Sequence, residues 1–436
     1  MSVREQGTLR NIMSCAAIGT SFATGTLSTR RASNAQRQSF SRHAVPGGVY
    51  VPRVTTNRRS VTRAVVAPDA PAPEVQWSAE MDPLARPPPF TLADIRAAIP
   101  KHCWEKSTMR SMSYLFRDVA IVAALGIAAT KISHPLMWIP YWIAQGTMFW
   151  ALFVVGHDAG HQSFSANKKV NDFIGNVVHS SILVPYHGWR ISHRTHHANH
   201  GHVENDESWH PISEEKYGEL KMSTMIGRYS PLALLAYPFY LYGRSPGKSG
   251  SHFNPKSDVF TGTVNGKRVA SDAEQVDVAV STACWAVMMG ILGAVGFTKG
   301  LGFLALSYFI PYLVNVMWLD AVTYLHHTDE SVPWYRGEEW SYMRGGISTT
   351  DRDYGLFSNI HHSIGIHLVH HLFPQIPHYH LVEATEAVKP VLGEYYREPE
   401  RAPWHGIPTH LIKEFTTSLK KCRFVPNEGS IVYYRN

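Results

Sequence analysis

The sequence predicts an all-α integral membrane protein with four transmembrane helices in two hairpins and a helical cap on one side of the membrane that carries a histidine-rich metal site. Three observations lead to this prediction. Four apolar stretches approach the roughly 20 residues that a helix needs to cross a bilayer. The stretches pair across very short turns, and most of the 25 histidines gather in two windows that begin where the hairpins end. Each hairpin returns to its starting side, so both windows are expected on one face.

The apolar stretches differ in length and therefore in how clearly each one predicts a transmembrane helix. The first is short unless it includes residues 114–116, so a buried helix of a soluble core is the alternative for it. The turns between paired stretches are residues 131–134 and 298–300. The expected spans cover about residues 115–130, 135–156, 278–297 and 301–319.

The net charge of +7 comes from the N-terminus. Residues 1–65 hold ten arginines, no lysine and one acid, Glu5, for a net charge of +9, so the rest of the chain sums to 7 − 9 = −2. A segment rich in Arg and Ser, poor in acids and without a continuous apolar run is typical of an organelle transit peptide. The alternative is a basic tail that binds nucleic acid or anionic lipid. Because the arginines are dispersed, we expect a transit peptide and no nucleic-acid partner.

Composition also divides the remaining chain. Residues 66–90 are rich in Pro and Ala and are expected to form a stiff linker without a core. Residues 91–436 are expected to form one membrane domain. The four cysteines form no CxxC pair, so the sequence indicates neither a thiolate zinc site nor an iron–sulfur cluster.

The histidines are strongly clustered. Residues 151–210 hold ten and residues 321–380 hold nine, whereas an even spread of 25 would place about seven in these 120 positions. Their spacings of three and four residues place imidazoles on one face of a helix. Eight imidazoles exceed the three or so protein ligands of a catalytic zinc, and imidazole also suits iron. We therefore predict two metal ions just outside the hydrocarbon. The eight are His157, His161, His193, His196, His197, His367, His370 and His371.

A ninth ligand is expected from the same face. His326 and His327 lie seven and eight residues past Leu319, so one of them can reach the cluster, and His361 and His362 are second candidates. Polar neighbours can orient metal-bound imidazoles through hydrogen bonds. The candidates for this role are Asp158, Asn199, Glu204, Asp206, Asp320, Asp351 and Asp353.

Three motifs resemble the histidine boxes of membrane fatty acid desaturases, and more narrowly those of the omega-3 (delta-15) branch. They are HDAGH at residues 157–161, the run that begins HRTHH at residues 193–209, and HHLFPQIPHYH at residues 370–380. The resemblance covers roughly residues 87–400. Segments similar to the plastid omega-3 enzymes are residues 87–104, 110–114 and 339–346.

The resemblance implies a di-iron centre that uses O2 and two electrons to place a cis double bond in a lipid acyl chain. The family's additional ligand matches His327, and His361 and His326 remain candidates for a further ligand or a supporting group, as does Asp158. The substrates implied are dienoic chains of membrane glycerolipids, converted from 18:2 to 18:3 and from 16:2 to 16:3. The chain shows no flavin or nicotinamide fingerprint, so ferredoxin is the expected electron donor and a chloroplast membrane, envelope or thylakoid, the expected location.

Two other functions stay open at this point. A delta-12 (omega-6) desaturase or a related di-iron lipid hydroxylase can be built on the same boxes. A histidine-rich metal transporter is disfavoured, because the four apolar stretches carry almost no ionisable residues to form a pathway.

Overall fold

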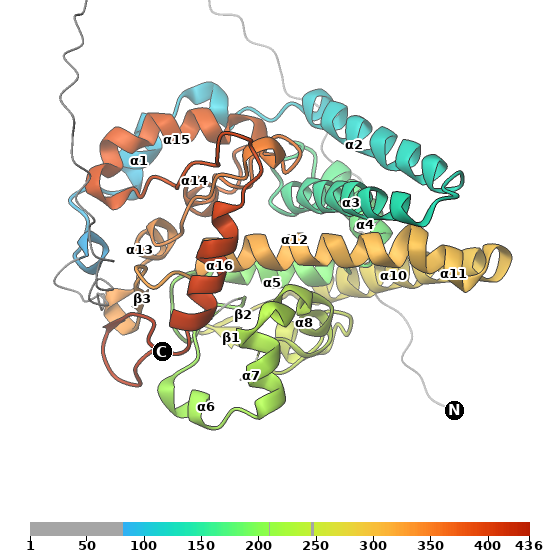
Figure 1. The fold of residues 1–436 in the computed structure, drawn as a ribbon. Helices are drawn as coiled ribbons and strands as arrows, with labels where there is room; N and C mark the ends of the chain where they lie inside the picture. Colours follow the sequence, from blue (N-terminus) through green and yellow to red (C-terminus); the bar gives the residue numbers. More distant parts are fainter. Residues whose placement is uncertain (1–81, 209, 246–247) are drawn as a thin grey trace, which may run out of the picture. The chain divides into compact units, whose positions relative to one another are not determined.

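The computed structural model describes residues 82–208, 210–245 and 248–436 (Figure 1). The predicted transit peptide and most of the linker lie outside the described residues. The described part belongs to one compact unit, Pro73–Asn436, and is mostly helical.

Four helices of the described chain are long and apolar enough to cross a membrane, as the sequence predicts. Two of them run past the apolar stretch that predicted them. Helix α3 continues from residue 156 to Gly160, and helix α12 continues from residue 319 to His327. A helix is held by its own backbone hydrogen bonds, so it need not end where its side chains become polar. The four are α2 (Thr108–Ala129), α3 (Trp138–Gly160, after the 3-10 turn η3, Pro135–Met137), α10 (Asp272–Lys299), and α12 (Ile310–His327, after α11, Leu301–Leu304, and the π-helical turn η5, Ala305–Phe309).

Helix α3 is the centre of this group and packs against α2, α12 and α4 (Lys168–Ser181). Its contact with α12 is close at Gly146, where a Cβ would lie 2.4 Å from the Cβ of Val314. Small residues permit such approaches between membrane helices. The other long helices turn large apolar side chains outward, such as Phe116 (64% exposed) and Phe297 (92% exposed). Exposed apolar surface of this extent is typical of a membrane-facing protein.

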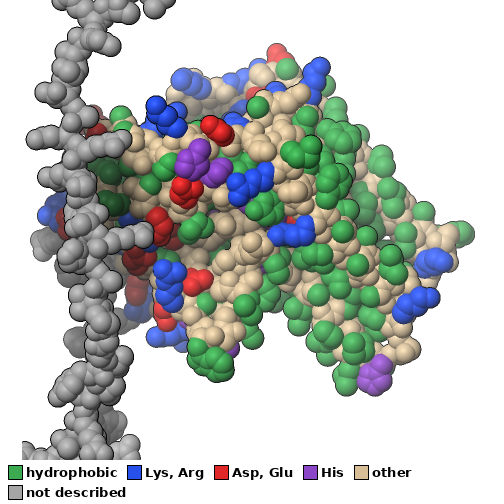
Figure 2. Space-filling model, turned by 90° about the horizontal axis from the view of Figure 1, so that it is seen from above, with side chains coloured by type: hydrophobic (Ala, Val, Ile, Leu, Met, Phe, Trp, Pro, Cys, Tyr) green, Lys and Arg blue, Asp and Glu red, His purple; other side chains and the backbone are tan. Residues whose placement is uncertain are grey.

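Hydrophobic side chains gather toward the right-hand part of the face in Figure 2, on the side where Figure 1 places the far ends of α2 and α11. Charged side chains lie mainly toward the opposite part of that face. This distribution fits a body with one lipid-facing and one polar region. The hairpin arrangement relative to a membrane, and the cap on one side of it, stay predictions.

The π-helical turn before α12 has an identifiable cause. Pro311 has no N–H, so the carbonyl of Ser307, four residues earlier, lacks its helical partner. The hydroxyl of Tyr141 donates to that carbonyl at 2.7 Å, and the indole of Trp142 donates to the carbonyl of Leu306 at 2.9 Å. Side chains of α3 therefore satisfy the backbone groups that the irregular turn leaves free.

Shorter helices form the remainder of the described unit. Two small antiparallel strand pairs, β1 with β2 and β3 with β4, were not predicted; β3 pairs Trp334 with Val432 of the C-terminal segment. The helices are α1 (Leu92–Ala98), α5 (Tyr186–Asn199), α6 (Glu214–Gly218), α7 (Met222–Tyr229), α8 (Tyr237–Gly243), α9 (Asp258–Thr261), α13 (Tyr342–Ile347), α14 (Leu368–Leu372), α15 (His378–Leu392) and α16 (His410–Lys421). The 3-10 turns are η1 (Pro83–Ala85), η2 (Lys101–Trp104), η4 (Pro231–Leu235), η6 (Gly337–Glu339), η7 (Gly355–Phe357) and η8 (Gly393–Tyr395), and the strands are β1 (Thr263–Val264), β2 (Lys267–Arg268), β3 (Trp334–Tyr335) and β4 (Ile431–Val432).

Candidate metal centre

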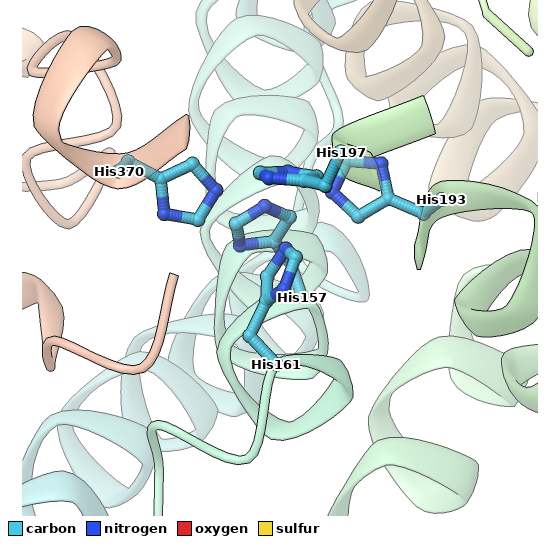
Figure 3. A group of neighbouring side chains, drawn as sticks. All are labelled: His157, His161, His193, His197 and His370. Carbon is cyan, nitrogen blue, oxygen red and sulfur yellow. The ribbon is translucent and has the colours of Figure 1, made fainter. Parts of the chain in front are cut away.

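Five of the predicted histidines converge from three helices and form what we call group A (Figure 3). One ligand nitrogen from each lies within 4.8 Å of those of the others. At both α3 and α5 the two members are four residues apart, which places them on one face of the helix. The members are His157 on α3, His161 directly after the last residue of α3, His193 and His197 on α5, and His370 on α14.

The other four predicted histidines meet around His327 at the end of α12, and we call them group B. The Nε2 atom of His327 lies 3.3 Å from Nε2 of His196 and 3.1 Å from Nε2 of His367. His371 completes the set, with one ligand nitrogen within 4.8 Å of those of His327 and His367. The structure thus brings all nine predicted histidines together and divides them five and four.

The distances within the groups fit metal ligation. Two nitrogens bound at a right angle to one ion, each about 2.1 Å away, are about 3.0 Å apart. The Nε2 atoms of His193 and His197 lie 3.1 Å apart, close to that spacing and to the two distances at His327. Several buried nitrogens of the groups also have no hydrogen-bond partner, including Nε2 of His161, His370 and His371. A metal ion would satisfy these atoms, whose burial without a partner is otherwise unfavourable.

Three imidazoles of group A have the protonation state that ligation needs. Burial, together with the charges of neighbouring histidines, lowers the pKa of His193, His197 and His370 well below the ordinary value of 6.5. These rings are therefore neutral near pH 7, and each keeps a lone pair for a metal ion.

A buried carboxylate, Asp206, orients group B. The Nδ1–H of His196 donates to Oδ1 of Asp206 at 2.6 Å, which leaves Nε2 of His196 free of a proton and directed at His327. Burial opposes ionisation of Asp206, but its interactions with His196 and His200, including the hydrogen bonds from both rings, hold its pKa well below its ordinary value. Asp206 is therefore an acceptor at neutral pH.

Two further aspartates support the groups. Asp158 accepts from Nδ1 of His157 at 3.3 Å and from Nδ1 of His378 at 2.9 Å, so it links a group A histidine to α15. Asp351 accepts from the backbone N–H groups of His367 and Leu368 at 2.7 and 2.8 Å. This bonding fixes the start of α14, the helix that carries two of the histidines.

The other polar candidates bond elsewhere. The closest hydrogen-bond partner of each is a backbone group or an arginine, and not the side chain of a group A or group B histidine. Asn199 donates to the Thr195 carbonyl, Glu204 accepts from Arg336, Asp320 accepts from the Tyr237 amide, and Asp353 accepts from the Gly355 amide.

The three remaining histidine candidates lie outside the groups. His362 donates from Nε2 to Oδ2 of Asp118 at 2.6 Å and, within the described residues, joins no group of metal-ligand atoms. His326 donates from Nδ1 to the carbonyl of Thr350 at 2.6 Å and accepts at Nε2 from the hydroxyl of Tyr354 at 3.1 Å, so both nitrogens are used, and its ring stacks on that of His367. His361 is fully buried among aromatic rings, 4.5 Å from the ring of Trp318, and burial lowers its pKa to about 3. Within the described residues His361 joins no group of metal-ligand atoms.

One histidine that sequence reasoning missed lies against group B. His200 offers a nitrogen within 4.8 Å of those of His196 and His327. It follows the last residue of α5, Asn199, so helical spacing gives no indication of its direction. The signal that could have found it is the acidic residue six positions later, because Asp206 accepts from Nδ1 of His200 at 3.1 Å.

A cavity of about 680 Å³ adjoins both groups. Its wall includes His157 and His193 of group A and His196, His327 and His367 of group B. This volume lies in the range of small-molecule and lipid-sized pockets. Most of the other lining side chains are apolar or aromatic, among them Trp150, Phe153, Trp189, Leu232, Leu235, Phe239, Leu319, Val322 and Ile364.

The family follows from comparison with known proteins. The model of a family described as fatty acid desaturase matches residues 134–401. The chain belongs to the fatty acid desaturase family. A second model, described as a domain of unknown function (DUF3474), matches residues 30–129. The metal groups and the cavity of this desaturase all lie within the described part of the chain.

Three relatives illustrate the similarity. The chain is 60% identical over 352 residues to an sn-2 acyl-lipid omega-3 desaturase (ferredoxin), chloroplastic, of Helianthus annuus, covering 80% of this chain and 77% of the relative. It is 56% identical over 393 residues to a chloroplastic omega-3 fatty acid desaturase of Brassica napus, covering 88% and 94%. It is also 57% identical over 352 residues to an endoplasmic reticulum omega-3 fatty acid desaturase of Vigna radiata var. radiata, covering 80% and 90%.

The role found for Asp206 gives a testable prediction. In D206N the side chain can turn an NH2 group toward His196, which disfavours the tautomer that offers Nε2 to a metal. We expect iron affinity to fall about 10- to 100-fold, measured by titrating the purified protein with Fe(II).

The matched control is E204Q, two residues away in the same loop, whose carboxylate bonds to Arg336 and to His202 and to no group histidine. Equal iron affinity of D206N and E204Q would contradict the role of Asp206.

Proposed function

We propose that this enzyme is a chloroplast omega-3 (delta-15) acyl-lipid desaturase that uses O2 and electrons from ferredoxin. Its substrates are dienoic chains of membrane glycerolipids, converted from 18:2 to 18:3 and from 16:2 to 16:3. The observation that carries the reaction type is the apolar cavity whose wall contains histidines of both groups. The names of the relatives support the position of the double bond, the acyl-lipid substrate and the electron donor.

In this proposal two iron ions are held by the nine predicted histidines, five in group A and four in group B. Iron with O2 supplies the oxidant needed to remove hydrogen from unactivated methylene carbons, which offer no acidic proton to a base. Burial helps to keep His193 neutral, and Asp206 directs Nε2 of His196.

The cavity positions the acyl chain. Its apolar wall, with Trp150 and Phe153 on α3 and Leu319 on α12, favours methylene groups by the hydrophobic effect and excludes water. Because histidines of both groups share this wall, two adjacent carbons of a chain in the cavity can lie beside both metal positions. Orientation of this kind contributes much of the rate enhancement in reactions without an activating group on the substrate.

The enzyme is expected in a chloroplast membrane, the envelope or the thylakoid. Relatives named chloroplastic and one named for the endoplasmic reticulum have similar sequence identity to this chain. The choice of membrane therefore depends on the arginine-rich residues 1–65. We expect a fusion of residues 1–65 to a fluorescent protein to enter plastids, as seen by microscopy in leaf cells. Reticular or cytosolic fluorescence would contradict this location.

Substrate feeding tests the reaction. The chain is expressed in a lipid-accumulating host with ferredoxin and its reductase, and 18:1 and 18:2 are supplied separately. We expect 18:3 with the new double bond at delta-15 from 18:2, and no product from 18:1, as measured by gas chromatography with mass spectrometry. Conversion of 18:1, or a hydroxylated product, would instead identify a delta-12 desaturase or a hydroxylase.

Ligand variants complete this test. H196A in group B and H370A in group A are expected to lower desaturation by at least about 100-fold, since each removes a metal ligand. H134A, a histidine at the exposed start of η3 whose ring caps only the backbone of Leu136, is the matched control. Normal desaturation by H196A or H370A would contradict the ligand assignment.

A further inference from the structure

We infer that His200 is a fifth ligand of the metal ion in group B, so that ten histidines, five in each group, hold the two ions. This inference rests on the proposed function, because it assigns a residue to one of the two metal positions. His200 lies in the run of residues 193–209 that begins with the second box, but it is not one of the nine histidines predicted as ligands from the sequence.

The direction of the His200 ring is the first observation. Nδ1 of His200 donates to Oδ2 of Asp206 at 3.1 Å, while Nδ1 of His196 donates to Oδ1 of the same carboxylate at 2.6 Å. A neutral imidazole that donates from Nδ1 keeps its lone pair on Nε2. One carboxylate therefore holds both rings in the tautomer that ligates through Nε2.

The free nitrogen of His200 is the second observation. His200 is 3% exposed, and its Nε2 atom has no hydrogen-bond partner. A ligand nitrogen of His200 lies within 4.8 Å of those of His196 and His327, and its ring centroid lies 4.6 Å from that of His327 and 4.7 Å from that of His371. A buried lone pair directed into a group of imidazoles is explained by a cation at its centre.

The backbone of His200 is fixed where this role needs it. The indole N–H of Trp340 donates to the carbonyl of His200 at 2.9 Å. Gly345 packs against the same carbonyl, and a Cβ at Gly345 would lie 1.9 Å from that oxygen. Trp340, which lies just before α13, and Gly345 in α13 therefore hold the backbone of His200 in place although α5 has ended.

The number of imidazole donors in each group also supports the inference. Group A offers five imidazoles to one ion, whereas group B without His200 offers four. With His200 both groups would offer the same number of nitrogen donors to a metal ion.

The test uses the full chain purified with 57Fe, and measures iron per chain together with the Mössbauer spectrum. We expect the unsubstituted chain to hold two ions. In H200A and H200Q the iron content is expected to fall from two ions toward one per chain, and only one of the two iron signals is expected to change, because group A is intact. H202A is the matched control: His202 is in the same loop and bonds to Asn205, outside both groups.

Each outcome decides the inference. If H200A and H200Q keep both ions and both signals, or lose both ions together, His200 is not a ligand of one ion. If the unsubstituted chain itself holds fewer than two ions, the proposed di-iron function is wrong. This outcome is distinguishable from a failure of the His200 inference alone, in which the unsubstituted chain holds two ions. A change in H202A equal to that in H200A would also overturn the inference.

Discussion

The burial of clustered imidazoles beside an apolar cavity is the constraint on which the rest of the site depends. Each such ring has two nitrogens, and a nitrogen buried without a partner is unfavourable by about 1 to 3 kcal/mol. Carboxylates and backbone groups accept from one nitrogen in several rings, as Asp206 does for His196 and His200 and Asp158 does for His157. Several of the nitrogens left over, such as Nε2 of His370 and His371, have no hydrogen-bond partner, and a metal ion would satisfy them.

Rigid elements hold those nitrogens in place. Helices α3 and α12 run on past their apolar stretches and carry His157, His161 and His327 to the other histidines. The contact of Gly146 with α12 and the bonds from Tyr141 and Trp142 to the π-helical turn fix these two helices against each other. Packing far from groups A and B therefore determines the distance between histidines on different helices.

The sequence predicted much of this arrangement, and physical reasons explain what it missed. Hydropathy located the four long helices, and spacings of three and four residues identified which faces of α3, α5 and α14 carry ligands. His200 lies beyond the end of α5, and the pairing of Asp158 with His378 joins residues 220 positions apart, so no local pattern predicts either contact. His361 could not be separated from the ligands by sequence, because only packing shows it among aromatic rings.

The most direct test of the two-ion centre is the iron content of three purified chains, with X-ray absorption at the iron edge. The unsubstituted protein should hold two iron ions per chain bound mainly by nitrogen, and H193A in group A and H367A in group B should each hold one. A single iron in the unsubstituted protein, or ligation mainly by sulfur or carboxylate, would contradict a centre built from two groups of histidines.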